Sequence, residues 1–141
     1  MIHEEICTYG VCKLAKEKGF PQDPDKNDHC LMYCWDGLRN IHPLAMWIVW
    51  EMEEYDHDNL YAAPTQSLLQ RWLREEKGVQ IYIDSDLDFD DETFVYEWQI
   101  ANKENFDNGG FEIHRYNSEE SYSTYELALA DALAYSLKNL V

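Results

Sequence analysis

Basic residues are scarce in this sequence: Lys and Arg together number 11 against 28 Asp and Glu, so the formal net charge is −17 at pH 7. A field of that sign repels the phosphates of nucleic acids and the headgroups of anionic membranes. It favours basic proteins or cations, and it also keeps a small protein soluble. We therefore expect a protein partner, and neither nucleic acid nor a membrane.

Glycine is also scarce, with six residues, and the motifs of several enzyme classes are missing. The sequence holds no glycine-rich phosphate loop, no Gly-x-Ser-x-Gly elbow and no His-Glu-x-x-His. A Cys–His pair stays open, but nothing singles one out. We expect no nucleotide or other cofactor, and no enzyme.

Long apolar runs are absent as well. The longest candidate, "PLAMWIVW", is far too short to span a bilayer. The first ten residues, "MIHEEICTYG", have neither the basic nor the apolar region of a signal peptide. Four cysteines without an export signal then indicate reduced thiols, so we expect a cytoplasmic protein.

What the sequence does contain is core material: 45% of its 141 residues are hydrophobic and 14% are aromatic. This length suits one domain, 1–141, and we distinguish an N-terminal portion, 1–62, from a C-terminal portion, 63–141. Most of the aromatic side chains, including those of "MWIVW" and "FVYEW", are expected in the core.

The C-terminal portion opens with a predicted helix. Pro64 suits its start, beside a capping Thr65 or Ala63, and Gly78 suits its end. One apolar face is formed by Leu68, Leu69, Trp72 and Leu73.

Three strands and a second helix follow. "VQIYID", "TFVYEWQIAN" and "FEIHRY" alternate as strands, with a tight turn at Asn108-Gly109. Ser123 and Glu126 form a capping box at the start of the last helix. Its apolar face is predicted to comprise Leu127, Ala130, Ala134, Leu137 and Val141. The fold class is therefore α+β: helix, three-stranded antiparallel meander, helix, with the helices covering one face of the sheet.

The N-terminal portion is less regular. The pattern predicts a helix capped by Thr8 and ended by Gly19, then a short hairpin with a two-residue turn at Asp36-Gly37. The stretch 42–55 fits a helix that starts at Pro43, although a buried strand stays open.

Three blocks, "CKLAKEKGF" (12–20), "APTQSLLQRWLREEKGVQIYI" (63–83) and "SYSTYELALADALAYSLKNL" (121–140), cover about half of the chain. Together they resemble a family of small acidic proteins from phages and prophages of gut bacteria. The resemblance implies an origin in a mobile element, and it transfers no catalytic residue.

The order of elements in 63–141 is also similar to that of the double-stranded RNA-binding domain, and "LLQRWL" is similar to its first helix. In that family, lysines at the start of the last helix bind phosphates. The matching stretch here, "YSTYELALAD", has no lysine and ends in Asp131. The resemblance implies a similar shape without RNA binding.

A dense acidic segment, "DSDLDFDDE" (84–92), lies between the first two strands of the meander. We interpret it as a solvated hairpin loop. Counting from Asp86 to Glu97 approximates a calcium loop, but Asp91 stands where such a loop needs glycine. The interaction candidates are these acids and two N-terminal aromatics: Asp84, Asp86, Asp88, Asp90, Asp91, Glu92, Trp35 and Trp50.

Four cysteines lie in the first third: Cys7, Cys12, Cys30 and Cys34. Zinc knuckles place two residues between paired cysteines, whereas here there are four and three. Buried thiols are the favoured interpretation, and a zinc site is the alternative. Arg71, Arg74 and Lys77 are interpreted as a solvated helix face, because Glu75 can pair with Arg71.

The leading functional hypothesis is a noncatalytic protein-interaction module with an acidic and aromatic surface. The first alternative is an acidic mimic of DNA that uses 51–58 and 84–92 to occupy the basic cleft of a host nuclease or regulator. The second is a zinc-binding or redox protein that uses the N-terminal cysteines. The simplest explanation of the many Asp and Glu residues is that they keep the protein soluble.

Overall fold

The computed structural model describes residues 4–22, 31–35, 41–45 and 61–141, with backbone alone at 31–35 and 41–45. The chain forms two compact units, Met1–Ser67 and Leu68–Val141. Their boundary falls inside a helix, five residues beyond the division at 62/63 used above. The fold class is α+β, as predicted.

The first unit begins with helix α1, Tyr9–Glu17. Its start is as predicted: the Oγ1 of Thr8 accepts a hydrogen bond from the backbone N–H of Val11 at 3.4 Å. Its end is as predicted too, because Gly19 has a φ of +94° and the N–H of Phe20 donates back to the carbonyl of Ala15 at 2.9 Å. The buried face of α1 consists of Val11, Cys12 and Ala15.

The first unit also contains a small antiparallel sheet, with strand order β2-β1-β3. It comprises β1 (Leu31–Trp35), β2 (Ile41–Ala45) and β3 (Tyr61–Ala63). The predicted hairpin is confirmed, but its two-residue turn is wrong. Trp35 pairs with Ile41, so the connection is five residues long.

The helix expected from Pro43 is also wrong, because Pro43 lies in β2 opposite Tyr33. Proline lacks the N–H of a sheet ladder, and an edge strand such as β2 tolerates that loss. The rest of that predicted helix, from residue 46 on, lies outside the described residues. Strand β3 was not predicted, since three residues are too few to show a period.

Helix α4, Gln66–Lys77, leads into the second unit. It starts two residues after Pro64, because the chain is still extended there: the Pro64 carbonyl accepts from the N–H of Cys7 at 2.9 Å. The predicted apolar face is confirmed, with Leu69 and Leu73 fully buried. Gly78 ends the helix at a φ of +69°.

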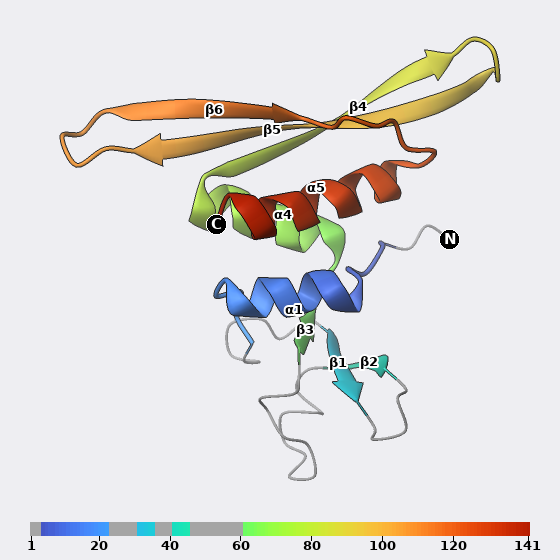
Figure 1. Cartoon of the computed structure of the whole chain (residues 1–141). Coiled ribbons are helices and arrows are strands. Elements are labelled where there is room, and N and C mark those ends of the chain that lie inside the picture. Colours follow the sequence, from blue (N-terminus) through green and yellow to red (C-terminus); the bar gives the residue numbers. More distant parts are fainter. Residues whose placement is uncertain (1–3, 23–30, 36–40, 46–60) are drawn as a thin grey trace. The chain divides into compact units, whose positions relative to one another are not determined.

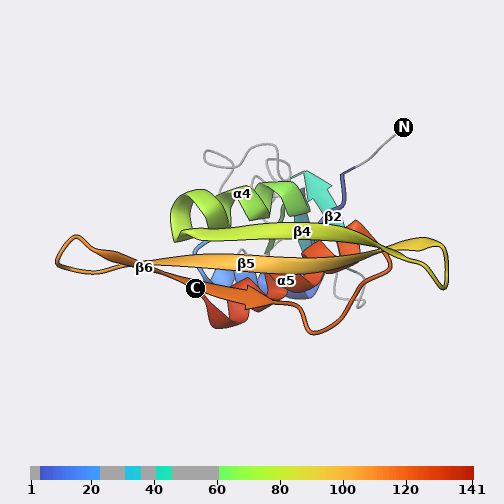
Figure 2. The same cartoon turned by 90° about the horizontal axis from the view of Figure 1, so that it is seen from above.

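The meander is confirmed as a sheet of order β4-β5-β6, antiparallel throughout. Its strands are β4 (Val79–Asp88), β5 (Thr93–Asn105) and β6 (Phe111–Asn117). Helices α4 and α5 both lie on one face of this sheet (Figure 1). The β4–β5 and β5–β6 hairpins extend beyond the helices at opposite ends (Figure 2).

The strands are longer than predicted. Residues 84–88, expected in a loop, belong to β4 and pair with 93–97 of β5. The turn itself is confined to 89–92, where Glu92 has a φ of +55°. The acids are tolerated in a strand because they alternate with residues on the opposite face, so their carboxylates reach solvent.

Helix α5, Tyr125–Asn139, is present where predicted, but its cap and face differ. Thr124 is the N-cap, not Ser123: its Oγ1 accepts from the N–H of Leu127 at 3.1 Å. Leu127 itself is 52% exposed. Of the five residues predicted for the apolar face, Leu137 alone is buried, and the buried apolar residues are Ala128, Leu129, Ala132, Leu133 and Leu137. Apolar residues occur on almost every side of this helix, so periodicity could not select the face.

In the part of the chain that the structure describes, no helix combines the length and the apolar character that crossing a membrane requires.

Candidate functional site: an acidic hairpin and an aromatic pocket

The first feature is the acidic hairpin, which we define as residues 84–97 of β4, β5 and their turn. Asp84, Asp86 and Asp88 alternate along β4, so their side chains project from the face opposite the helices. Glu97 lies directly across from Asp84 on β5. The amide Nε2 of Gln99 donates to the Oδ2 of Asp84 at 2.7 Å. The hairpin therefore presents a stripe of carboxylates.

More carboxylates surround the turn. The Oδ1 of Asp88 accepts from the backbone N–H groups of Asp90 and Asp91, at 3.0 and 3.4 Å. This local bonding orders the turn, and the side chains of Asp90, Asp91 and Glu92 are exposed. A calcium loop is not formed by this arrangement: its first two acids, Asp86 and Asp88, lie in a strand.

Exposed apolar side chains accompany the acids. Phe89 in the turn is 81% exposed, and Phe94 at the start of β5 is 61% exposed. Phe94 lies opposite Leu87, which is 36% exposed. The expectation that "FVYEW" belongs to the core is correct for Trp98 and wrong for Phe94, because the hairpin extends past the helix that would cover it (Figure 1).

The aromatic candidates chosen from the sequence lie elsewhere. Trp35 is in β1, but the structure describes only its backbone, and Trp50 lies outside the described residues, as do 51–58. The aromatic residues that accompany the acids are therefore Phe89 and Phe94. Alternation of apolar and polar residues predicts a strand, but it does not show whether a helix covers the end of that strand.

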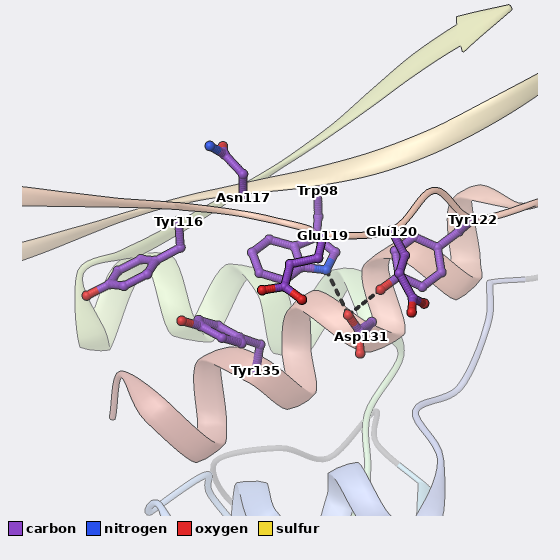
Figure 3. A pocket seen from close by; sticks show the side chains of 8 residues that line it. All are labelled: Trp98, Tyr116, Asn117, Glu119, Glu120, Tyr122, Asp131 and Tyr135. Atoms are coloured by element: carbon purple, nitrogen blue, oxygen red, sulfur yellow. Dashed lines mark hydrogen bonds between the residues drawn. The ribbon is translucent and has the colours of Figure 1, made fainter. Parts of the chain in front are cut away.

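The second feature is the aromatic pocket, a hollow with a volume of about 480 Å³ that β5, β6, the segment after β6 and α5 enclose (Figure 3). Four aromatic side chains, three acids and one amide line it, and none of these eight residues is basic. They are Trp98, Tyr116, Tyr122, Tyr135, Glu119, Glu120, Asp131 and Asn117. Asn117 points to the opposite side of β6 from the others (Figure 3).

A bulge after β6 places Glu119 and Glu120 at this pocket. The N–H of Ser118 donates to the carbonyl of Trp98 at 2.9 Å, which continues the β5–β6 ladder. A regular ladder would then put Glu120 opposite Tyr96, but Tyr122 pairs there through two hydrogen bonds of 2.7 and 2.8 Å. Two extra residues are therefore looped out of the ladder between Ser118 and Tyr122. Such bulges redirect side chains next to functional sites.

Three of the aromatic side chains, those of Trp98, Tyr116 and Tyr135, form a continuous wall. The centroid of Tyr135 lies 5.0 Å from that of Trp98 and 5.7 Å from that of Tyr116, with interplanar angles of 40° and 51°. Trp98 is 4% exposed, so the inner part of the wall belongs to the core. Tyr116 and Tyr135 are half-buried, which leaves part of the wall open to a ligand.

Asp131 connects the wall to the bulge. Its Oδ2 accepts a hydrogen bond from the indole Nε1 of Trp98 at 2.9 Å and another from the hydroxyl of Tyr122. Burial, reinforced by the hydrogen bond to Asp131, raises the pKa of Tyr122 to about 12. The Tyr122 hydroxyl therefore keeps its proton, and can donate, to a higher pH than an ordinary tyrosine. In the sequence, Asp131 was notable only as an acid near the place where an RNA-binding domain has lysine.

Two of the four cysteines can be placed fully. Cys7 and Cys12 are both buried, and the Sγ of Cys12 lies 3.7 Å from the carbonyl oxygen of Cys7. Cys30 lies outside the described residues, and Cys34 is in β1 with only its backbone described. The burial of Cys7 and Cys12 agrees with their interpretation as small core residues, and a zinc site that includes all four stays a prediction.

Another group of residues could hold a metal ion. Glu104, Glu112 and His114, on the helix-facing side of the β5–β6 hairpin, bring one ligand atom each within 4.8 Å of one another. Glu104 and Glu112 lie directly opposite each other, and the Nε2 of His114 is 3.0 and 3.8 Å from their carboxylates. A hydrogen bond between the imidazole and Glu104 accounts for this grouping without an ion.

The solvated basic face of α4 is confirmed. Arg71, Arg74 and Lys77 are exposed, and the Nε of Arg71 is 2.9 Å from the Oε1 of Glu75. The order of elements is α4, β4, β5, β6, α5, as predicted from the sequence pattern, and the first turn of α5 carries Glu126 and no lysine. Comparison of the chain with protein-family models, with curated proteins and with solved structures found no match.

Proposed function

We propose that this chain is a noncatalytic interaction module of phage or prophage type that binds a basic protein through the acidic hairpin. The observation that carries the proposal is the make-up of that hairpin. Residues 84–97 hold seven carboxylates, and no Lys or Arg occurs between Gly78 and Asn102. Phe89 is exposed in the turn beside these acids, and Phe94 is exposed on the other face of the same hairpin.

Solubility alone would account for the acids but not for the aromatic side chains beside them. Exposed carboxylates accelerate association with a basic surface and set its orientation. Aromatic side chains supply much of the affinity of protein interfaces once a partner buries them. A hairpin that carries both is suited to a partner with a basic surface and an apolar depression.

The test is capture of proteins from a bacterial host lysate on the immobilised full chain. We expect a basic protein to be retained and then released as salt rises from about 0.1 to 1 M, which shortens the Debye length from about 10 to 3 Å. The variants Asp90→Asn/Asp91→Asn and Phe89→Ser should each lose most of that protein. A matched control with the same charge change, Glu76→Gln/Asp107→Asn, should retain it.

Two outcomes would contradict the proposal. The first is a wild-type bait that retains no protein beyond the empty matrix at low salt. The second is equal loss with the hairpin variant and the control, which would show that only total charge matters.

A DNA mimic is the second candidate, and the spacing of the acids on β4 favours it. Alternate residues of a strand lie about 6.6–6.8 Å apart, so Asp84, Asp86 and Asp88 form a regular row of negative charge. A mimic would be displaced from its partner by excess duplex DNA, and Phe89→Ser would leave binding unchanged. If the chain instead binds through Phe89, excess duplex DNA would not displace it from its partner, and Phe89→Ser would weaken binding.

A further inference from the structure

We propose that the aromatic pocket receives the side chain of an arginine from the partner polypeptide. This inference rests on the proposed function, because a basic partner supplies the ligand. The pocket is nevertheless separate from the acidic hairpin, so the two can be tested independently.

The charges around the pocket select a cation. Glu119, Glu120 and Asp131 line it, and no basic residue does. The carboxylate of Asp131 is engaged by Trp98 and Tyr122. Among the described residues, Glu119 and Glu120 form no hydrogen bond or ion pair of their own. Two carboxylates are therefore available to a ligand at the bulge.

The aromatic wall distinguishes between kinds of cation. A methylated ammonium is held best when rings surround it, but here Tyr135 touches both Trp98 and Tyr116, with centroids 5.0 and 5.7 Å apart. No ammonium group fits between rings at those separations. These three rings offer a surface on which a planar guanidinium can stack.

The carboxylates favour the same ligand. A guanidinium has five N–H donors in a fixed fork, which matches carboxylate acceptors in two directions at once. Glu119 and Glu120 are adjacent on the bulge and next to the wall (Figure 3). One arginine can therefore stack on the wall while its N–H groups donate to the bulge. A lysine ammonium would gain the charge attraction without the stacking.

The volume is also suitable. At about 480 Å³ the pocket falls within the range of about 300–1,000 Å³ that is typical of sites for small ligands. One guanidinium side chain would occupy part of this volume, and water would fill the rest.

The test is an NMR titration of the ¹⁵N-labelled full chain with N-acetyl-arginine-N-methylamide, followed at the indole N–H of Trp98. The lysine and trimethyllysine analogues serve as competitors of equal charge. We expect saturable binding in the millimolar range for the arginine compound, with each analogue about tenfold weaker. Glu119→Gln/Glu120→Gln should weaken arginine binding about tenfold, because it removes both negative charges and replaces one acceptor oxygen of each carboxylate by a donor NH₂, while the side-chain shapes stay the same.

The variant Asp90→Asn/Asp91→Asn carries the same charge change and should bind the arginine compound within about twofold of wild type. Absence of a saturable shift at Trp98 would overturn the inference, as would tighter binding of either analogue or equal binding by Glu119→Gln/Glu120→Gln. None of these results affects the lysate capture, in which Asp90→Asn/Asp91→Asn tests binding through the acidic hairpin. The two proposals can therefore fail separately.

Discussion

Replacing Asp131 by alanine should destabilise the second unit, because this side chain is the shared acceptor for two others. The indole N–H of Trp98 donates to it at 2.9 Å, and Trp98 is only 4% exposed. Leaving a buried donor without a partner costs about 1–3 kcal/mol. The Tyr122 hydroxyl is half-buried and can turn to water, so its lost bond adds only about 0.5–1 kcal/mol.

The expected total for Asp131→Ala is about 2.5 kcal/mol. Urea unfolding followed by circular dichroism would measure it, as a midpoint lowered by roughly 1 M at an unchanged slope. Asp131→Asn keeps an acceptor oxygen in the same place and should lose less than about 1 kcal/mol. Asp107→Ala, at an exposed turn, should stay within about 0.5 kcal/mol of wild type.

The reasoning would be refuted if Asp131→Ala were as stable as Asp107→Ala. It would also be refuted if asparagine and alanine at position 131 were equally costly, since the loss would then come from charge or helix effects and not from the shared acceptor. Either result would mean that the aromatic wall is held by packing alone.

Three further predictions follow from α5 and its flank. Leu133→Ala should cost about 2–5 kcal/mol in the free energy of unfolding, while Leu127→Ala should cost under about 1, because the first side chain is fully buried and the second is 52% exposed. Thr124→Ala should lower the melting temperature through loss of about 1 kcal/mol of capping, whereas Ser123→Ala should leave it unchanged. The Tyr122 pKa is about 12 in the fold against 10.0 for the unperturbed group, so the unfolded chain loses this proton first and stability falls as pH rises from 10 to 12. Tyr122→Phe should make that fall shallower, and an identical slope in both proteins would contradict the assignment.

Local signals predicted much of this fold correctly. Gly19 and Gly78 end helices at positive φ, as their positions after apolar-periodic segments indicated. The three strands of the meander were visible from alternation, and the turn at Asn108-Gly109 is present, with Gly109 at a φ of +87°. These features depend on a few consecutive residues, so sequence alone contains the necessary information.

The errors share a different origin, which is tertiary context. Pro43 suits the start of a helix, yet it lies in an edge strand, where it pairs with Tyr33, ten residues earlier in the chain. Leu127 and Leu129 are equally apolar, and only packing leaves one exposed and buries the other. Short-range patterns cannot decide between such alternatives.

The candidate site likewise has features that the sequence predicts and features that depend on tertiary context. The acids from Asp84 to Glu92 are evident in the sequence, because charge depends on residue type alone. The exposure of Phe89 and Phe94 depends on where the helices stop covering the sheet. The pocket depends on two residues looped out of a ladder, and the pairing of Tyr122 with Tyr96 that reveals them has no sequence signature.

The most direct test of the central claim is carbodiimide cross-linking of the full chain in a host lysate, which joins carboxylates to lysines in contact. The acidic hairpin holds seven of the chain's 28 acids, so random coupling would place about a quarter of the cross-links there. We predict that most cross-links to one basic protein arise from residues 84–97. Cross-links spread over all acids in proportion to their number, or concentrated on α4, would contradict a specific interaction through this hairpin.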